Sequence, residues 1–386
     1  MRRKIAVVTS SRADYSHLYW VLKDLAAHPD VDLQLIAMAS HLSPSFGLTV
    51  REIEKDGFHL AGRIECLISS DSDIGMAKTI GVAAQSFADL LGHLRPDLLL
   101  LIADRYEMLA PASVALALRI PIAHIEGGEV SEGAIDDAVR NALTKMSHIH
   151  FVSTHLACAR VIAMGEEEWR VHRAGAPSLD HLRRSKLLGR EELESRLAID
   201  LITPPILVAY HPVTLRRETT EEADALFAAL EKVTDTVLFC YPNADAGSHQ
   251  LIESTKRFLA HRKNDGRVFI NLDAVTYLSL LRHAEMLVGN SSSGIMEAAS
   301  FALPTVNVGF RQKGRERAKN VLDAEPIAAS IVGKITEARS DAFRRSLTGM
   351  ENPYGDGHAA ERIVRVLTQV PLGDELLIKK APELPV

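Results

Sequence analysis

The sequence is poor in cysteine and has no long apolar run. Its three cysteines, Cys66, Cys158 and Cys240, lie far apart and lack the spacing of a metal site. Because the cysteines are few and odd in number, they argue against a disulfide framework and fit a protein of the reducing cytoplasm. The longest apolar stretch, near 98–103, is far too short to span a bilayer. Since the amino terminus runs straight into a predicted strand, we expect no signal peptide and no membrane association.

The motifs of several common enzyme classes are also absent. There is no GxxxxGK[ST] and no GxGxxG, so ATP hydrolysis and a dinucleotide cofactor are not indicated. There is no HExxH and no serine on a nucleophile elbow. His148 and His150 alternate along a predicted strand, so their side chains point to opposite faces and cannot bind one metal ion. We therefore expect neither a metal nor an organic cofactor.

The overall composition is that of a water-soluble globular protein. The chain has 386 residues, of which 47% are hydrophobic and 24% charged. This length suits two domains. The formal net charge of −6 argues against general binding of nucleic acid. Any contact with phosphate must therefore come from a local arrangement of residues.

Short apolar runs alternate with amphipathic helical segments along the chain. The runs lack polar alternation, which is typical of parallel strands covered by helices on both faces. The expected strands are 5–9, 33–39, 98–103, 120–125, 149–153, 206–210, 237–241, 268–271, 286–288 and 305–308. The expected helices are 15–27, 74–94, 107–118, 136–146, 154–164, 220–233, 247–261, 275–283 and 295–301. This pattern predicts an α/β protein with two facing, doubly wound, Rossmann-like parallel-sheet domains.

The joint between the domains is expected between Gly175 and Pro205, where glycine, proline and a charged helical stretch occur. We assign residues 1–175 to an N-terminal domain and 176–356 to a C-terminal domain. Residues 357–386 are expected to form a helix that crosses back onto the first domain, with a loosely held tail from Pro371. Ligands of such sheets bind at the carboxyl ends of the strands, so two facing domains would share one cleft.

The segment Gly289–Glu297, GNSSSGIME, lies between a predicted strand and a predicted helix. Backbone N–H groups and hydroxyls at a helix N-terminus favour an anion, most often phosphate. The candidate ligands are Ser291, Ser292 and Ser293. Glu297, one turn into the helix, is placed to accept hydrogen bonds from a sugar hydroxyl. The alternative is that the serines only cap the helix.

Carboxylates follow two neighbouring strands of the N-terminal half and begin the next helix. Asp104 comes directly after one buried strand, and Glu126 after the next. Gly127 and Gly128 then follow, which would let a substrate approach the backbone closely. Asp136 and Asp137 stand at the start of the helix that comes next. Acids held close together can differ in protonation, as proton removal and delivery on one sugar require. The alternative is that the aspartates cap helices.

Other polar residues also lie at predicted strand ends. Arg12 and Ser16 follow the first strand and could contact a phosphate or a base. His211 follows the first strand of the second domain and could donate to a phosphate oxygen. Arg311 or Arg315, in a basic segment after the last predicted strand, could meet a nucleotide's charge. The alternatives are a surface arginine beside a helix cap, a structural histidine and a solvated basic face.

In this order, these segments resemble the hydrolysing UDP-N-acetylglucosamine 2-epimerases. The resemblance covers about Lys4 to Leu367. Its segments are SRADYS from Ser11, DRYEMLA from Asp104, AHIEGGEVSEGAIDD from Ala123, HPVT from His211, PNADAGS from Pro242 and GNSSSGIMEA from Gly289. HIEGGE with IDD downstream, together with GNSSSGIMEA, is a highly specific combination.

The resemblance implies a GT-B-like fold in which the C-terminal domain holds most of the UDP. It implies a cytoplasmic homo-oligomer, dimer or tetramer, that needs no cofactor. UDP leaves by anti elimination across C1 and C2, and water then adds to the glycal, so that UDP-N-acetylglucosamine gives N-acetylmannosamine for sialic acid synthesis. Asp104, Glu126 and Asp136 are implied as catalytic residues. Implied in binding UDP or the sugar are Arg12, Ser16, His211, Asn243, Ser291, Ser292, Ser293, Glu297 and Arg311.

Which UDP-sugar is used stays open at this point. Relatives act on UDP-N,N′-diacetylbacillosamine and make 2,4-diacetamido-2,4,6-trideoxymannose for legionaminic acid. The two substrates differ at C4 and C6, and no motif reports on those positions. Family size alone favours UDP-N-acetylglucosamine. More remote alternatives are a non-hydrolysing epimerase, a GT-B glycosyltransferase and a non-catalytic nucleotide-sugar sensor.

Two positions depart from the family pattern. Ala103 stands where the family usually has glycine before the acid. Asn141, after Arg140, stands where histidine is frequent, which bears on the choice of substrate.

Overall fold

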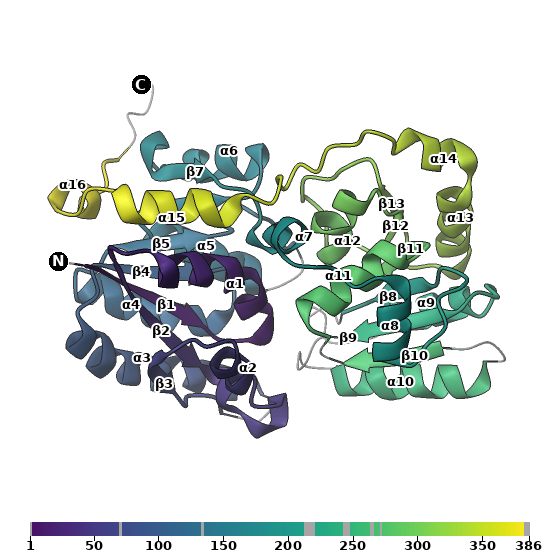
Figure 1. The fold of residues 1–386 in the computed structure, drawn as a ribbon, viewed down its shortest axis with the longest axis horizontal. Helices are drawn as coiled ribbons and strands as arrows, with labels where there is room; N and C mark the ends of the chain where they lie inside the picture. The colour runs from purple at the N-terminus through teal and green to yellow at the C-terminus, as the bar shows by residue number, and fades with distance from the viewer. Residues whose placement is uncertain are drawn as a thin grey trace. The chain divides into compact units, whose positions relative to one another are not determined.

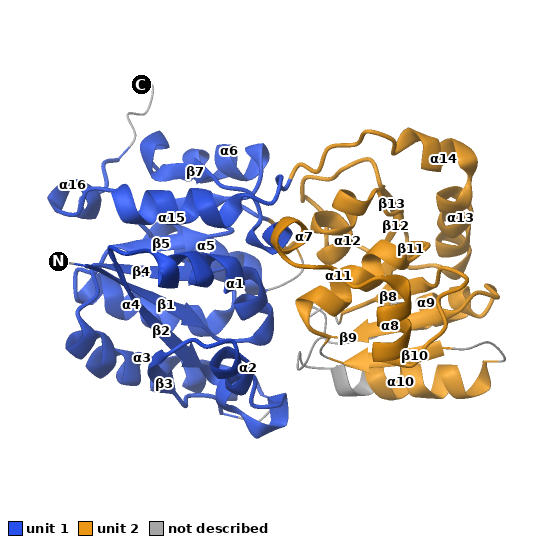
Figure 2. Ribbon diagram, viewed as in Figure 1, with its two compact units in different colours: residues 1–129, 135–180, 354–386 blue, residues 130–134, 181–353 orange. Residues whose placement is uncertain are grey.

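The computed structural model describes residues 2–68, 72–132, 135–211, 221–241, 248–262, 266–270 and 272–381. The chain divides into two compact units (Figure 2). Unit 1 comprises 1–129, 135–180 and 354–386, and unit 2 comprises 130–134 and 181–353. The chain therefore leaves unit 1 for a few residues between Glu129 and Ile135, and returns to it for good at Tyr354.

Unit 1 is built on a seven-stranded sheet with the order β3-β2-β1-β4-β5-β6-β7 (Figure 1). Its strands are β1 (Arg3–Thr9), β2 (Val31–Met38), β3 (Leu60–Ile64), β4 (Leu98–Ile102), β5 (Ile122–Ile125), β6 (Ile149–Val152) and β7 (Val171–Arg173). All the neighbouring strands pair in parallel. The strand order reverses between β1 and β4, and this is where open α/β sheets place their ligands.

Helices cover both faces of this sheet. They are α1 (Arg12–Ala27), α2 (Val50–Lys55), α3 (Asp73–Leu94), α4 (Leu109–Ala117), α5 (Ile135–Met146), α6 (His155–Ala163), α15 (Ala359–Gln369) and α16 (Asp374–Leu377). α1 and α15 bury Leu18, Leu22 and Ile363 in one core cluster. α3, α4 and α5 contribute to a second cluster, with Phe87 and Leu143 fully buried. Alternate residues of β1 and β4 enter the two clusters, which explains why these strands are apolar throughout.

Unit 2 is built on a six-stranded parallel sheet with the order β10-β9-β8-β11-β12-β13. The strands are β8 (Ile206–Ala209), β9 (Val237–Tyr241), β10 (Gly266–Ile270), β11 (Met286–Gly289), β12 (Thr305–Val308) and β13 (Val321–Ala324). Its helices are α8 (Arg190–Leu197), α9 (Glu221–Leu230), α10 (Ser248–His261), α11 (Ala274–His283), α12 (Ser293–Met296), α13 (Ala328–Arg339) and α14 (Asp341–Ser346), while α7 (Asp180–Arg184) begins at the boundary. Within the described residues, no helix is both long and apolar enough to cross a membrane.

The prediction of an α/β protein with two parallel sheets is confirmed, with three strands missed. β3, β7 and β13 escaped notice because each is an edge or near-edge strand with partly exposed residues, so its sequence is not a continuous apolar run. The helix expected over 295–301 is shorter than predicted. It is α12 followed by a 3-10 helix over Ala298–Phe301.

The carboxyl-terminal segment is bonded to unit 1, contrary to the expectation of a loosely held tail. Arg170 is fully buried and donates to the backbone carbonyls of Glu375, Leu376 and Ile378, at 2.9, 2.8 and 2.9 Å. The Nζ of Lys379 donates to two further backbone carbonyls, those of Lys145 and Ser147, each at 2.8 Å. These partners are more than 200 residues away in sequence, so no local pattern could have indicated them.

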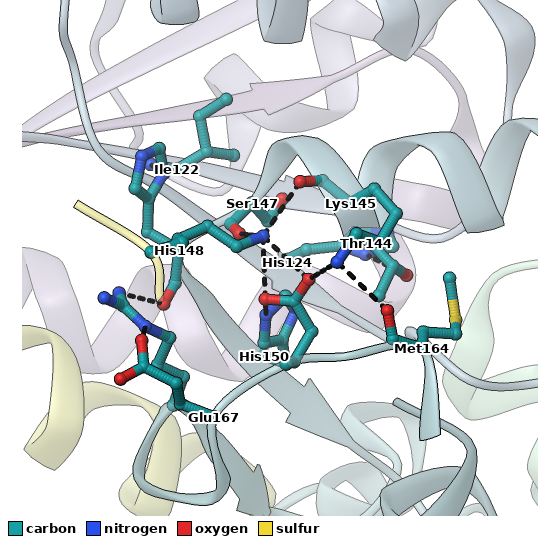
Figure 3. A network of polar contacts seen from close by, with 12 residues as sticks. Ile122, His124, Thr144, Lys145, Ser147, His148, His150, Met164 and Glu167 are labelled. Atoms are coloured by element: carbon teal, nitrogen blue, oxygen red, sulfur yellow. Dashed lines mark hydrogen bonds and ion pairs between the residues drawn. The ribbon is translucent and has the colours of Figure 1, made fainter. Parts of the chain in front are cut away.

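A fully buried carboxylate, Glu166, takes part in this attachment. Figure 3 shows the surrounding network of polar contacts, including Lys145 and His150. The oxygens of Glu166 accept hydrogen bonds from Lys145, from His150 Nε2 at 3.0 Å and from Lys379 at 2.8 Å. Burial alone would raise the pKa of Glu166, but these three donors outweigh it and lower the pKa to about 2. Glu166 therefore stabilises the fold as an anion.

This arrangement predicts a loss of stability in acid. The contribution of Glu166 is complete above its ordinary pKa of 4.5 and is lost as the pH falls towards about 2. Glu166→Gln should lower the stability of unit 1 at neutral pH by roughly 1–2 kcal/mol, because Lys145 is half-exposed and solvent screens part of the interaction.

The measurement is urea denaturation at a series of pH values. Tryptophan fluorescence reports on unit 1, since both tryptophans, Trp20 and Trp169, belong to it. The difference between the wild type and Glu166→Gln should shrink between about pH 4.5 and 2. The exposed Glu168→Gln is the matched control and should follow the wild type. A difference independent of pH would contradict the assignment.

Candidate functional site

Two of the predicted catalytic carboxylates lie at adjacent strand ends in unit 1. β4 and β5 pair in parallel, with Ile102 opposite Ile125. Asp104 and Glu126 follow these paired residues at the carboxyl edge of the sheet. Glu126 is buried and Asp104 half-buried. The structure thus brings together two acids that are 22 positions apart in the printed sequence.

Arg140, from the second turn of α5, joins this edge to the following helix. Its side chain is 2% exposed and forms an ion pair with Asp104. The same guanidinium donates to the backbone carbonyl of Glu129 at 3.0 Å and lies 3.9 Å from the carboxylate of Asp137. A buried guanidinium keeps its charge and has several donors in a fixed plane. Arg140 therefore fixes Asp104 relative to the first turn of α5.

Asp136 lies in that first turn and is half-buried. Its neighbour Asp137 contacts its own helix, accepting from Asn141 Nδ2 at 3.2 Å and facing Arg140. Through Arg140, the first turn of α5 is thus tied to the strand end that carries Asp104. Asn141, the position noted for substrate choice, orients Asp137.

The backbone is strained at both strand ends. Ala103, directly before Asp104, has a φ of 61°, and Glu126 has a φ of 67°. The left-handed conformation costs a non-glycine residue roughly 1–2 kcal/mol. Backbone hydrogen bonds hold both residues in place, from Ala103 N to Ile125 O at 3.0 Å and from Glu126 N to Phe151 O at 2.8 Å. Strained residues of this kind cluster at functional sites.

The protein's own packing excludes a side chain at Gly128 and leaves little room for one at Gly127. A Cβ on Gly128, whose φ is 76°, would lie 2.4 Å from the backbone oxygen of Ala157. A Cβ on Gly127 would lie 3.0 Å from Thr144 Oγ1 and 3.3 Å from His124 Nδ1. These glycines thus also have a packing role, and their role in substrate approach stays a prediction.

The turn after β1 is ordered by hydrogen bonds of its own. Ser11 caps α1, because its side chain accepts from Asp14 N, and the buried Asp14 accepts from Ser10 N and Oγ at 3.1 and 2.7 Å. Burial raises the pKa of Asp14. Arg12 pairs with Glu52 at 3.2 Å, and Ser16 is half-buried on the same helix. The cap of α1 is thus Ser11.

The structure adds two histidines that sequence reasoning had not assigned to the site. Nδ1 of His17 lies 2.9 Å from Oε1 of Glu126. His124 is fully buried and its Nε2 lies 2.8 Å from the carbonyl oxygen of the strained Ala103. Burial lowers the pKa of His124 to about 4, so it is neutral at neutral pH and donates this bond. The sequence signal available was only that His124 lies within AHIEGGE and that His17 directly follows SRADYS.

In unit 2, the serine-rich loop follows β11 as predicted. Gly289 has a φ of 144°, and a Cβ there would lie 2.1 Å from Ala209 O, so only glycine allows β11 to approach β8. The amides of Asn290 and Ser291 donate to that same carbonyl, at 3.1 and 3.2 Å. The amide of Ser293 donates to Ser291 Oγ at 3.3 Å. These three amides, expected to favour an anion, are thus bonded within the loop. The N-cap of α12 is Ser292, whose side chain makes no cap hydrogen bond.

Asn290, fully buried, connects the ends of three strands in unit 2. Its side chain accepts from His211 N at 2.7 Å and donates to His211 O at 2.8 Å. Its backbone oxygen accepts from Arg311 at 3.1 Å and from Gln312 at 2.8 Å. The predicted binding residues His211 and Arg311 are therefore held at the serine loop by a residue that was not itself predicted.

The remaining candidates of unit 2 lie in and beside this loop. Ser293 is buried and accepts a hydrogen bond from Tyr277 at 2.9 Å, while Ser291 and Ser292 are half-buried. Glu297 is buried at the end of α12. Arg315 donates to the backbone oxygen of Val130 at 2.9 Å, and its role in meeting a nucleotide's charge stays a prediction. Asn243 lies outside the described residues.

The chain is similar in sequence to one family of known proteins. A family model described as UDP-N-acetylglucosamine 2-epimerase matches residues 23–368. The chain is 38% identical over 326 residues to the GDP/UDP-N,N′-diacetylbacillosamine 2-epimerase (hydrolyzing) of Campylobacter jejuni, covering 84% of this chain and 85% of that one. It is 37% identical over 386 residues to the UDP-N,N′-diacetylbacillosamine 2-epimerase (hydrolyzing) of Legionella pneumophila, covering 98% and 99%.

The chain belongs to the UDP-N-acetylglucosamine 2-epimerase family.

Solved structures agree on the fold. The UDP-GlcNAc 2-epimerase of Neisseria meningitidis, in a crystal structure bound to UDP-GlcNAc, matches with a TM-score of 0.80 over 94% of this chain and 99% of that one. The identity is 18%, so this likeness speaks for the fold alone. With the two parallel sheets, it confirms the predicted GT-B-like fold class.

The backbone conformation of Ala103 gives a physical reason to expect glycine at position 103. The family resemblance leads one to expect glycine at this position, and a φ of 61° is a conformation that glycine adopts without steric cost. Ala103 is therefore strained. We expect Ala103→Gly to stabilise unit 1 by roughly 0.5–1 kcal/mol, since relief of strain exceeds the entropy that glycine adds to the unfolded chain.

Urea denaturation followed by tryptophan fluorescence measures this effect. The matched control is Ala88→Gly on the exposed face of α3, where glycine should destabilise by roughly 0.5–1 kcal/mol. The two substitutions should thus act in opposite directions. Destabilisation of similar size in both variants would show that Ala103 is not strained.

Proposed function

We propose that the protein is a hydrolysing UDP-sugar 2-epimerase. The observation that carries this proposal is the convergence, at one edge of the unit 1 sheet, of Asp104, Glu126 and the first turn of α5, which carries Asp136. Inversion at a sugar carbon needs a group that removes a proton and a group that delivers one. The two hydrolysing relatives, 37–38% identical, support the same reaction class.

The substrate that the relatives favour is UDP-N,N′-diacetylbacillosamine. Both hydrolysing relatives are named for it, and together their matches cover 84–98% of this chain. The product would then be 2,4-diacetamido-2,4,6-trideoxymannose. UDP-N-acetylglucosamine, giving N-acetylmannosamine, is the second candidate and is supported by the name of the family model.

The proposed reaction has two steps. A carboxylate of unit 1 takes the proton from C2 while the C1–O bond to UDP breaks, which leaves a C1–C2 double bond. Water then adds to this glycal, placing hydroxyl on C1 and a proton on the opposite face of C2. Asp104, which faces the permanent cation Arg140, is suited to orient the sugar or the water. Glu126 and Asp136 are the groups proposed to move protons.

Unit 2 is proposed to hold UDP. The hydroxyls of Ser291, Ser292 and Ser293 would contact the phosphates, and Glu297 the ribose. His211 and Arg311 are proposed to contact the nucleotide from the adjacent strand ends, at which Asn290 holds them. Arg12, Ser16 and Asn243 complete the binding set that we propose. A homo-oligomer in the cytoplasm is proposed from family resemblance.

Identification of the products tests this proposal. Each UDP-sugar is incubated with the protein in D₂O without an acceptor, and the products are followed by NMR. We expect release of UDP and deuterium at C2 of the inverted sugar, with faster turnover of UDP-N,N′-diacetylbacillosamine. Retention of the C2 proton, or release of UDP only when an acceptor sugar is present, would exclude the epimerase in favour of a glycosyltransferase.

Glu126→Gln tests the carboxylate directly. Loss of the proton-transferring group should lower kcat by roughly 10²-fold or more, while the affinity for UDP stays close to that of the wild type. Isothermal titration with UDP and initial rates of UDP release measure the two quantities. The exposed Glu168→Gln serves as control. Unchanged turnover in Glu126→Gln would remove Glu126 from the mechanism.

A further inference from the structure

His17 contacts Glu126 from another element of unit 1. Its Nδ1 lies 2.9 Å from Glu126 Oε1, although 109 residues separate the two in sequence. The side chains of His17 and Glu126 are 27% and 11% exposed. We propose that His17 is a positioning residue for Glu126, whose hydrogen bond orients the carboxyl group for proton transfer. This inference rests on the proposed function and deepens it.

The helix that carries His17 is held rigidly. Tyr15 and Leu18, which flank His17 on α1, are buried in the core. The hydroxyl of Tyr15 donates to Asp56 at 2.6 Å, and the ring packs edge-on against Phe58 with centroids 6.2 Å apart. At the first turn, Ser10 donates to Asp14. A side chain on an element fixed in this way can hold a second group accurately.

Glu126 needs such a partner for two reasons. Its carboxyl group is largely removed from water, and a buried charge is tolerated only when it is hydrogen-bonded. Its backbone also has a φ of 67° directly after the end of β5, so the side chain leaves the sheet from a strained position. A hydrogen bond between Nδ1 of His17 and the carboxyl group limits rotation of that group.

The partners of the two adjacent carboxylates differ in kind. Asp104 faces Arg140, whose guanidinium cannot lose its proton in a protein. Glu126 faces His17, a partially exposed imidazole that can release or accept one. Of the two strand-end acids, Glu126 is therefore the one with a partner that can adapt when its own protonation changes during turnover. This assigns proton transfer to Glu126 and a fixed electrostatic role to Asp104.

The test compares His17→Leu with His17→Asn. Leucine removes the donor at similar size, whereas the amide of asparagine can place an N–H near the position of Nδ1. We expect His17→Leu to lower kcat by roughly 10-fold or more with little change in UDP affinity, because only the orientation of the reacting carboxyl group is lost. His17→Asn should recover most of kcat. A merely structural role would not produce recovery with asparagine.

Controls separate this effect from a general loss of stability. His93 is an exposed histidine near the end of α3, and His93→Leu and His93→Asn should both resemble the wild type. Thermal unfolding of every variant is measured in parallel. Wild-type kcat in His17→Leu, equal losses in His17→Leu and His17→Asn, or a loss confined to UDP affinity would each overturn the proposal.

Failure of this inference is distinguishable from failure of the proposed function. If the wild-type protein releases no UDP from either UDP-sugar, the proposed function fails. If the wild type shows deuterium at C2 and Glu126→Gln is inactive, but His17→Leu is fully active, the function stands and His17 is not a positioning residue.

Discussion

The ion pair between Arg140 and Asp104 is the interaction on which the candidate site of unit 1 depends. Asp104 follows a strand whose residues are all buried, and Arg140 itself is 2% exposed. Removing one member of a buried pair leaves an uncompensated charge at a cost of roughly 3–5 kcal/mol. The same guanidinium reaches the carbonyl of Glu129 and the carboxylate of Asp137. One side chain thus sets the position of a strand end, a loop and a helix start.

The strained backbone at Ala103 and Glu126 is understandable in this setting. A strand that ends in a left-handed residue turns its next side chain sharply away from the sheet, which exposes a carboxylate at the edge. Such a conformation persists only where the surroundings hold it. Two side chains hold the end of β4. The buried, neutral His124 is hydrogen-bonded to the carbonyl oxygen of Ala103, and Arg140 forms an ion pair with Asp104. In unit 2 the end of β11 is instead formed by Gly289, which has no side chain to clash, and by Asn290, whose buried side-chain amide bonds to the backbone of His211.

The attachment of the carboxyl-terminal segment follows the same physical rule in a place unrelated to the candidate site. Arg170 and Lys379 satisfy backbone carbonyls that would otherwise lack donors, and Glu166 balances the charge of Lys379 and Lys145. Buried charges are tolerated where each has partners. This network holds α16 against the unit that contains the amino terminus, which the segment's own composition gave no reason to expect.

Sequence alone determined the fold class, most strands and the candidate residues at their carboxyl ends. It could do so because apolar periodicity marks buried parallel strands, and polar residues directly after such strands must lie at one edge of a sheet. Only the tertiary structure decided which side chains meet there. The pairs His17–Glu126, Arg140–Asp104 and Asn290–His211 join residues 36–109 positions apart. It also showed that Gly127 and Gly128 make room for neighbouring protein atoms, because a missing Cβ has meaning only when the atoms around it are known.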